Sequence, residues 1–368
     1  MIPVSEPLFI SSEKKYLAKC VDSGWLSSEG PFVQEFEQKF SRFVGKKYGI
    51  AVSSGTAALE VAMGAIGLKP GDEVIMPTFT IVACPLAVIA YDGVPVFVDS
   101  EPETWNIDVN KIEEKITKKT KAIMPVHIYG HPCDIDRIMK IARKYNLLVI
   151  EDAAEAHGAE YKGEKAGSFG DISCFSFYAN KIISTGEGGM ILTDNRKYVE
   201  RAKTLRNLAH MKGKRFYHKE LARNYRMSNL QAAVGTAQLK NIKKLIEIKR
   251  KNAKKYTERL KGISGLQLPV EKKIVKNVYW MYGIVLNEST GFSAETFAQK
   301  LAAEGIDTRP FFYPLHLQPV FKKLKIKCKG TYPVAERIAR QGLYLPSGLA
   351  LRDWQIGKVC RAIKGLLK

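Results

Sequence analysis

Short apolar runs recur along the first half of the chain, and segments with helical spacing of apolar residues separate several of them. The runs predict seven strands, at residues 48–52, 73–76, 95–98, 121–126, 147–151, 171–178 and 189–193. Helical spacing occurs at residues 32–44, 56–66, 109–118 and 134–145. This alternation is typical of an α/β fold, in which helices cover both faces of a mainly parallel sheet. Such sheets bind ligands at the carboxyl ends of their strands.

The last of these strands is predicted to run in the opposite direction. Only residues 179–188 separate it from the preceding run, and this connection is too short for a helical crossover. We therefore expect residues 189–193 to turn back antiparallel. This topology places Lys181 at a strand end, near Asp152, which closes the apolar run that begins at Leu147.

The pattern changes after about residue 242. A long basic helix comes first, followed by a predicted strand at 278–286, a helix at 294–304 and the segment RPFFYPLH. The apolar window at 74–91 approaches membrane-spanning length, but Pro77 and Pro85 interrupt it, so we interpret it as a buried strand and a core helix. The chain opens with MIP and a polar segment, with no sign of a signal peptide.

The charge of the chain is high, with 58 Lys and Arg against 37 Asp and Glu, a net charge of +21. Nucleic acid, a membrane surface or an anionic substrate would each suit such a charge. The basic residues are spread along predicted helices, as in KNIKKLIEIKRKNAKKYTERLK from residue 240, and no helix-turn-helix or basic tail stands out. We interpret them as solvated helix faces and expect neither nucleic acid nor membrane as a partner.

Cysteine and histidine spacing gives no indication of a metal site. The six cysteines, at positions 20, 84, 133, 174, 328 and 360, show no paired spacing, which favours a reduced cytoplasmic protein over a disulfide framework. The run from His127 to Asp134, HIYGHPCD, matches no common zinc pattern, and Asp134 fits the N-cap of the next helix.

Asp152 and Lys181 bring an acid and an amine to one edge of the predicted sheet. A partly buried ion pair is one interpretation. The other is pyridoxal phosphate, whose aldehyde bonds covalently to a lysine amine and whose ring nitrogen stays protonated beside a carboxylate. Such a cofactor also needs a site for its phosphate. SSGTAAL, at residues 53–59, follows a strand and opens a helix, so Gly55 permits a tight turn and the amides of Thr56 and Ala57 suit an anion.

Together with EDAAEAHGA, CFSFYANKIISTGEGGM, NYRMSNLQAA and RPFFYPLH, these features resemble the DegT/DnrJ/EryC1/StrS family of sugar aminotransferases, nearly end to end. The resemblance implies the aspartate aminotransferase fold (fold type I), with a large cofactor domain and N-terminal arm at 1–241 and a smaller α+β domain at 242–368. It also implies pyridoxal phosphate as the cofactor. A related dehydratase branch has histidine where Lys181 stands, so this chain looks like a transaminase.

Further residue roles are implied by the resemblance alone. Glu155 matches a position near the ring hydroxyl, and Ser176 matches a serine that bonds the cofactor phosphate. Asn229 matches an asparagine that reaches the cofactor phosphate of a neighbouring subunit, which implies a homodimer with shared sites; a helix cap is its alternative interpretation. Many relatives stack an aromatic residue on the cofactor ring where this chain has Ile81, so either Ile81 or Phe79 is expected to contact the ring.

The expected reaction moves an amino group from L-glutamate to the 4-keto carbon of a nucleotide-linked 4-keto-6-deoxy sugar. Lys181 is expected to act as general base and acid, and Asp152 to keep the ring nitrogen cationic. His218, Arg309, Tyr313 and His316 are candidates for binding the nucleotide sugar, because arginine in particular suits a diphosphate. A GDP-linked sugar is expected first, with a UDP-linked sugar as the alternative. A nucleic-acid-binding or regulatory protein on the same scaffold is the remote alternative.

Overall fold

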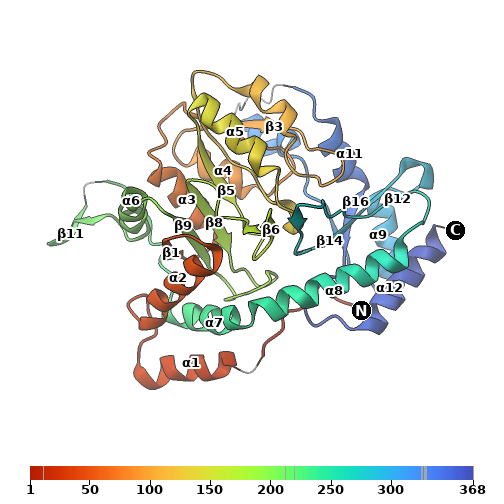
Figure 1. The fold of residues 1–368 in the computed structure, drawn as a ribbon, viewed down its shortest axis with the longest axis horizontal. Helices are drawn as coiled ribbons and strands as arrows, with labels where there is room; N and C mark the ends of the chain where they lie inside the picture. The colour runs from red at the N-terminus through yellow and green to blue at the C-terminus, as the bar shows by residue number, and fades with distance from the viewer. Residues whose placement is uncertain (11, 212, 219, 325, 327–329, 368) are drawn as a thin grey trace.

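A seven-stranded sheet forms the centre of the computed structural model, which describes residues 1–10, 12–211, 213–218, 220–324, 326 and 330–367 (Figure 1). Its order is β1-β9-β8-β5-β4-β2-β3. The strands are β1 (Tyr48–Val52), β2 (Glu73–Pro77), β3 (Val94–Val98), β4 (Thr120–Ile123), β5 (Leu148–Asp152), β8 (Ile172–Ser176) and β9 (Gly189–Thr193). Only β9 is antiparallel to its neighbours, β8 and β1. The expected mainly parallel sheet with a reversed last strand is confirmed.

Alternate side chains of each strand enter two different cores, because successive residues of a strand point to opposite faces. On one face, Val74 and Met76 of β2 pack with α3 (Gly55–Ala65) and α4 (Ala83–Ile89). On the other face, Ile75 packs with Ile138 of α5 (Ile135–Tyr145). Covering helices on both faces explain why the strands read as continuous apolar runs. The interpretation of residues 74–91 as a strand and a core helix is confirmed.

One predicted helix is wrong. Residues 109–118 form two 3-10 turns, η1 (Val109–Lys111) and η2 (Glu113–Lys115), and Ile116 is already extended. The Asp108 side chain accepts hydrogen bonds from both the backbone and the side chain of Asn110. Such local bonds compete with the regular helical pattern. By contrast, Asp134 caps α5 as predicted, accepting from the backbone N–H of Arg137.

A four-stranded antiparallel sheet organises the C-terminal part, as expected for a smaller α+β unit. Its order is β12 (Leu266–Gln267), β14 (Tyr282–Leu286), β16 (Gly342–Leu345) and β15 (Arg309–Pro310). Helices α8 (Ile242–Leu260), α9 (Ala294–Ala303) and α12 (Asp353–Leu366) contribute to its core. Ile2 joins this core too, and its N–H donates to Gly305 O, so both termini lie at this end of the molecule (Figure 1).

The predicted strand at 278–286 begins later than expected, at Tyr282. Tyr279 has a φ of 48°, in the left-handed region, so the chain turns there and cannot continue a strand. The remaining elements are α1 (Ser12–Ser23), α2 (Pro31–Val44), α6 (Arg196–Arg206), α7 (Asn229–Lys240), α10 (Pro319–Lys323), α11 (Pro333–Gln341), η3 (Ile128–Gly130), η4 (Glu288–Thr290), η5 (Leu315–Leu317), β6 (Glu160–Tyr161), β7 (Glu164–Lys165) and β13 (Val275–Lys276).

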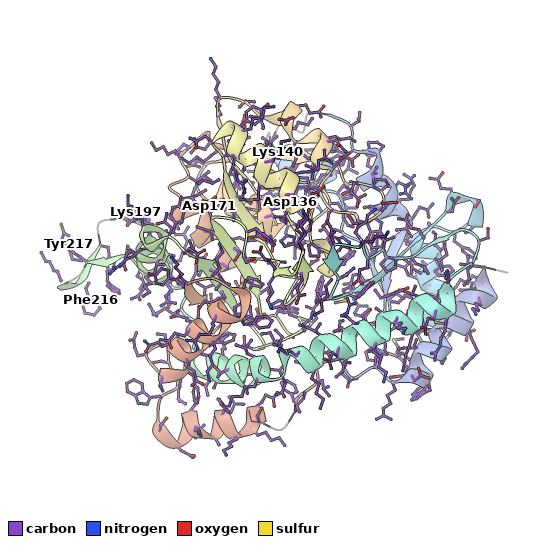
Figure 2. The ribbon with its side chains drawn as sticks, in the orientation of Figure 1. Asp136, Lys140, Asp171, Lys197, Phe216 and Tyr217 are labelled. Carbon is purple, nitrogen blue, oxygen red and sulfur yellow. The ribbon has the colours of Figure 1, made fainter. Side chains whose placement is uncertain are left out.

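A hairpin of β10 (His210–Met211) and β11 (Lys214–His218) projects from the body beside α6 (Figures 1 and 2). Phe216 and Tyr217, at its outer end, are exposed. In the described ranges, no helix is both long and apolar enough to cross a bilayer. Five cysteines are free and buried, and Cys328 lies outside the described residues.

Candidate active site

A cavity of about 380 Å³ contains Asp152 and Lys181, at the carboxyl ends of β5 and β8. This is the edge of a parallel sheet at which ligands bind. Its volume lies in the range of small-molecule sites. The lining residues are Ser54, Gly55, Thr56, Leu59, Ile81, Ala83, Val126, Asp152, Ala154, Glu155, Cys174, Ser176, Tyr178, Asn180, Lys181, Glu187, Trp280, Phe312 and Tyr344.

The acidic pair that closes β5 divides between the two faces of the sheet. Asp152 lines the cavity, where its Oδ1 accepts from Ala154 N at 3.0 Å and its Oδ2 accepts from Cys84 Sγ at 3.1 Å. Glu151 faces away, and its Oε2 lies 3.0 Å from His127 Nε2 while its Oε1 accepts from Gly170 N. Because side chains alternate along a strand, Asp152 faces the cavity. Glu151 points to the opposite face, where its hydrogen bonds stabilise the fold.

Lys181 lies against an aromatic wall. Its Nζ is 3.7 Å from the centroid of the Trp280 ring. Burial lowers the pKa of Lys181, and the negative charges of Glu155 and Asp152 oppose that effect. Burial also raises the pKa of Glu155 to about 7, although the Lys181 charge and the Tyr129 N–H, which donates to Glu155 Oε2 at 2.7 Å, act in the other direction. The cavity therefore holds an amine and an acid whose pKa values are both shifted by burial, as is common at functional sites.

The start of α3 forms one wall of the cavity. Ser54 is the N-cap, and its Oγ accepts from the N–H of Ala57 at 3.0 Å. The Ala57 amide is therefore not free for an anion, contrary to our expectation, because the helix begins one residue earlier than predicted. Gly55 and Thr56 occupy the first two helical positions, whose N–H groups have no partner within a helix, and both line the cavity.

Asn229 packs against the loop between α1 and α2. The side chain is buried; its Oδ1 accepts from Phe32 N at 2.8 Å and its Nδ2 donates to Trp25 O at 2.6 Å. The cap of α7 is the preceding residue, Ser228. Asn229 thus fixes the loop that connects α1 to α2, and it does not line the Lys181 cavity.

The four candidates for binding the nucleotide sugar lie outside the cavity lining. His218 is on the projecting hairpin, where its Nδ1 lies 2.6 Å from Leu208 O. Arg309 is exposed on β15 and pairs with Asp307, and Tyr313 is also exposed. His316 is bonded at both ring nitrogens, to Thr78 Oγ1 at 2.7 Å and to Glu336 Oε1 at 3.1 Å.

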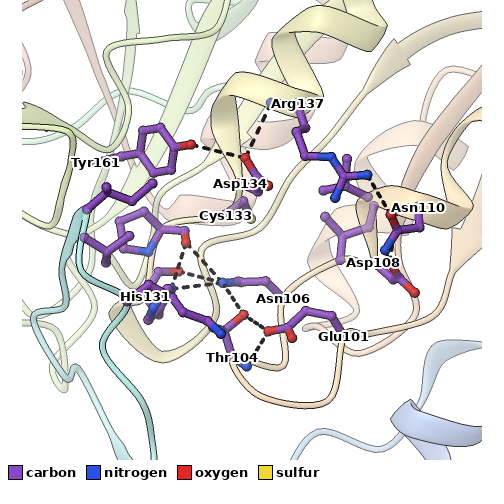
Figure 3. Close-up of a pocket in the computed structure, with 16 residues that line it drawn as sticks. Glu101, Thr104, Asn106, Asp108, Asn110, His131, Cys133, Asp134, Arg137 and Tyr161 are labelled. Atoms are coloured by element: carbon purple, nitrogen blue, oxygen red, sulfur yellow. Dashed lines mark hydrogen bonds between the residues drawn. The ribbon is translucent and has the colours of Figure 1, made fainter.

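A second cavity, of about 360 Å³, lies beside the start of α5 (Figure 3). Several of its polar groups are already bonded to one another. Arg137 Nη2 donates to Asn110 Oδ1 at 2.6 Å, and Tyr161 OH donates to Asp134 Oδ1 at 3.1 Å. Within the residues that the structure covers, no three His, Cys, Asp or Glu side chains are grouped to hold a metal ion.

Comparison with known proteins shows the enzyme family of this chain. Residues 8–364 match the DegT/DnrJ/EryC1/StrS aminotransferase family. The chain belongs to that family. It is 42% identical to the GDP-perosamine synthase of Escherichia coli O157:H7 over 98% of this chain and 97% of that protein. It is 41% identical to the GDP-perosamine synthase of Vibrio cholerae over 99% and 98% of the two chains. The crystal structure of the aminotransferase TlmJ from Streptoalloteichus hindustanus superposes with a TM-score of 0.92, at 29% identity, over 100% of this chain and 99% of that one.

This aminotransferase depends on pyridoxal phosphate, and the cavity fits that cofactor. A Cβ on Gly55 would lie 2.7 Å from Ser176 Cβ, and one on Gly189 would lie 2.2 Å from Ser54 O. The chain therefore keeps both positions bare where the start of α3 meets β8 and β9, leaving backbone amides and the Ser176 hydroxyl to meet a phosphate. Asp152 and Lys181 provide the carboxylate and the amine that the rest of the cofactor needs.

Ile81 lines the cavity with 47% of its surface exposed, whereas Phe79 is fully buried among other aromatic rings. Of the two residues, Ile81 is therefore the one that faces the cavity. Sequence reasoning missed Cys84, Trp280, Phe312 and Tyr344. Cys84 lies at the start of the predicted core helix, but the apolar pattern there gives no sign that its thiol faces Asp152. Trp280 and Tyr344 could not be found from the sequence, because the tertiary fold brings them from the C-terminal part of the chain.

Proposed function

We propose that this aminotransferase converts GDP-4-keto-6-deoxymannose to GDP-perosamine, with L-glutamate as the amino donor. The carrying observation is the similarity, across nearly the whole of both chains, to three proteins named GDP-perosamine synthase, at 40 to 42% identity. The cavity supports the proposal, because it joins a lysine, an aspartate and an anion site at one sheet edge. Pyridoxal phosphate supplies an aldehyde that carries the amino group and a ring that takes up electrons.

Lys181 and Asp152 perform the central steps in this proposal. The Lys181 amine would hold the cofactor covalently at rest. When free, Lys181 Nζ would act as the general base that takes the proton from the α-carbon of glutamate and as the general acid that returns it. The lowered pKa of Lys181 suits this task, because a neutral amine is needed to accept a proton. Asp152 would keep the ring nitrogen of the bound cofactor cationic, and Glu155 would meet the ring hydroxyl.

The anion site and the aromatic walls orient the bound molecules. The amides of Gly55 and Thr56, with the Ser176 hydroxyl, would hold the cofactor phosphate. Ile81 would contact one face of the ring. Arg309 and Tyr313 are exposed in the segment that places Phe312 in the cavity, so they extend the site toward a nucleotide diphosphate. His316, bonded to Thr78 and Glu336, fixes the loop that leads to Ile81.

The proposal includes a homodimer with shared sites. The hairpin that carries His218 projects from the body, and exposed Phe216 and Tyr217 at its end suit burial against a second copy (Figure 2). A partner hairpin would bring His218 to a cavity other than its own. Asn229 contributes by fixing the loop at Trp25, whose side chain is half exposed. We place the enzyme in the cytoplasm, because its five described cysteines are free.

The visible absorbance of the lysine-bound cofactor tests the proposed function. The enzyme is first bleached with L-glutamate, and GDP-linked or UDP-linked 4-keto-6-deoxy sugar is then added separately. Recovery of the band with the GDP-linked sugar alone is the expected result. Recovery with the UDP-linked sugar alone would replace the proposed substrate. No band after addition of pyridoxal phosphate would contradict the role of Lys181 itself.

A further inference from the structure

Lys181 has no ion pair at the cavity, and the indole of Trp280 is its close partner. Among the described residues, no carboxylate oxygen lies within 4.0 Å of Lys181 Nζ, the distance that an ion pair requires. The amine instead lies 3.7 Å from the centroid of the Trp280 ring, which is 5% exposed. An ammonium over a tryptophan face is attracted by the ring quadrupole, and the attraction is strongest where water is excluded. The ring therefore stabilises the charged amine at the cavity wall.

A hydrogen bond holds the Trp280 indole to the backbone next to Lys181. Its Nε1 donates to Asn180 O at 2.9 Å, and Asn180 directly precedes Lys181. The backbone before it is equally constrained: Tyr279 is in the left-handed region and its N–H donates to Asn277 Oδ1 at 2.8 Å. A Cβ on Gly130 would lie 3.0 Å from Trp280 N, so the two backbones are in direct contact. The indole therefore has little freedom to move away from Lys181.

A buried lysine donates a hydrogen bond to the backbone carbonyl of Trp280. Lys249, on α8, is 5% exposed, and its Nζ donates to Trp280 O at 2.5 Å and to Ser347 O. Burial lowers the pKa of Lys249 to about 7. Placing an amine in such surroundings without a carboxylate reduces stability. Two backbone carbonyls offset part of that penalty, and one of them belongs to Trp280.

We propose that Trp280 is a positioning residue for Lys181: its indole face holds the lysine amine at the cavity wall whenever that amine is not covalently bound, and Lys249 fixes Trp280 for this purpose. Without the indole, the charged amine would lose this contact in a buried cavity where neither Glu155 nor Asp152 is within ion-pair distance of it. The inference rests on the role proposed for Lys181, but the indole contact is a separate claim about this side chain.

The test measures the pKa of Lys181 in the full-length protein freed of pyridoxal phosphate. The pH dependence of Lys181 acetylation by acetic anhydride, quantified by peptide mass spectrometry, gives this pKa directly. Trp280→Leu keeps an apolar wall but removes the ring face, so it should lower the pKa of Lys181 by about one unit. Trp280→Phe should shift it less, and Trp354→Leu, an exposed tryptophan on α12, should leave it unchanged.

The same variants give a kinetic readout. On addition of pyridoxal phosphate at a pH below the Lys181 pKa, the lysine-bound band should form faster in Trp280→Leu than in the wild type, because a lower pKa leaves more of the amine neutral and able to attack the aldehyde. A Lys181 pKa that is unchanged or raised in folded Trp280→Leu would overturn the proposal. That result would leave the proposed aminotransferase function unaffected. Turnover by Lys181→Ala, by contrast, would contradict the proposed function itself.

The part of the proposal that concerns Lys249 is tested by a double-mutant cycle. Lys249→Met should lower the Lys181 pKa in the presence of Trp280 and add nothing in Trp280→Leu, because it acts through the indole. Lys249→Arg keeps a buried donor and provides a second variant if the methionine form does not fold. Equal effects of the Lys249 substitution with and without Trp280 would contradict the positioning role of Lys249.

Discussion

Cys84 Sγ donates a hydrogen bond to Asp152 Oδ2 at 3.1 Å, and both side chains are buried. The bond joins the start of α4 to the end of β5, so the helix helps to hold the carboxylate that faces the cavity. Burial and the adjacent Asp152 charge raise the pKa of the Cys84 thiol well above its usual value, so the thiol stays a donor.

This contact predicts that the donor matters more than the sulfur. Cys84→Ser retains an O–H donor and should keep kcat within about threefold of the wild type. Cys84→Val has a similar shape without a donor, and loss of a hydrogen bond to a charged group, about 1.5–3 kcal/mol, should lower kcat at least tenfold. Asp152→Asn provides the reference for complete loss of the carboxylate. Equal kcat in the serine and valine variants would contradict the role of this bond.

Lys181→Ala should bind pyridoxal phosphate without a covalent bond and lose turnover by several orders of magnitude, because nucleophile and proton carrier are the same group. Borohydride reduction followed by intact mass measurement checks this: the wild type should retain the cofactor mass and the variant should not. Lys197→Ala, on the exposed surface of α6, is the matched control (Figure 2). Near-normal turnover in Lys181→Ala would rule out the mechanism.

Gly55→Ala should weaken cofactor binding. Its Cβ would lie 2.7 Å from Ser176 Cβ, and overpacking of this kind costs about 1–3 kcal/mol. Relief of this contact would move the Gly55 and Thr56 amides away from Ser176, and loss of a hydrogen bond to a charged phosphate should raise the Kd for pyridoxal phosphate in equilibrium dialysis by about 10- to 100-fold. Gly365→Ala, on α12 with no atom within 4 Å of the added Cβ, should leave the Kd unchanged and stabilise its helix slightly. Equal affinities in both variants would show that Gly55 is not part of the phosphate site.

His157 should make the protein sensitive to acid. Burial, reinforced by the Lys181 charge, lowers the pKa of His157 to about 3 in the folded state. The unfolded chain binds a proton near pH 6.5. Its contribution to stability is therefore complete above pH 6.5 and is lost as the pH falls toward 3, by up to about 1.4 kcal/mol per pH unit.

Urea unfolding across this pH range checks the effect of His157. His157→Leu fills the space among Phe40, Phe175 and Phe177 without a titrating group. The difference in unfolding free energy between wild type and variant should change with pH below 6.5 and stay constant above it. A difference that is constant throughout would assign acid sensitivity to other groups.

Much of the framework was predictable because it is local. The seven strands were found because parallel strands covered on both faces are continuous apolar runs, and Asp134 was found because a cap is set by neighbouring residues. The predicted helix at 109–118 is wrong even though the apolar spacing there is helical. Asp108 accepts hydrogen bonds from Asn110, and the segment forms 3-10 turns instead. The Ala57 amide was assigned to an anion because the helix start was misplaced by one residue, and helix ends are the least certain part of any sequence pattern.

The sequence by itself determined the α/β architecture, the reversal of β9, and the presence of Asp152, Lys181 and a glycine-opened helix at one sheet edge. Each of these follows from residue order and strand alternation. Only the tertiary structure decided what surrounds them. Cys84 against Asp152, Trp280 against Lys181 and Lys249 against Trp280 join segments 68, 99 and 31 residues apart, respectively. Such contacts leave no periodic pattern, because they depend on how separate layers pack and not on the geometry of any one helix or strand.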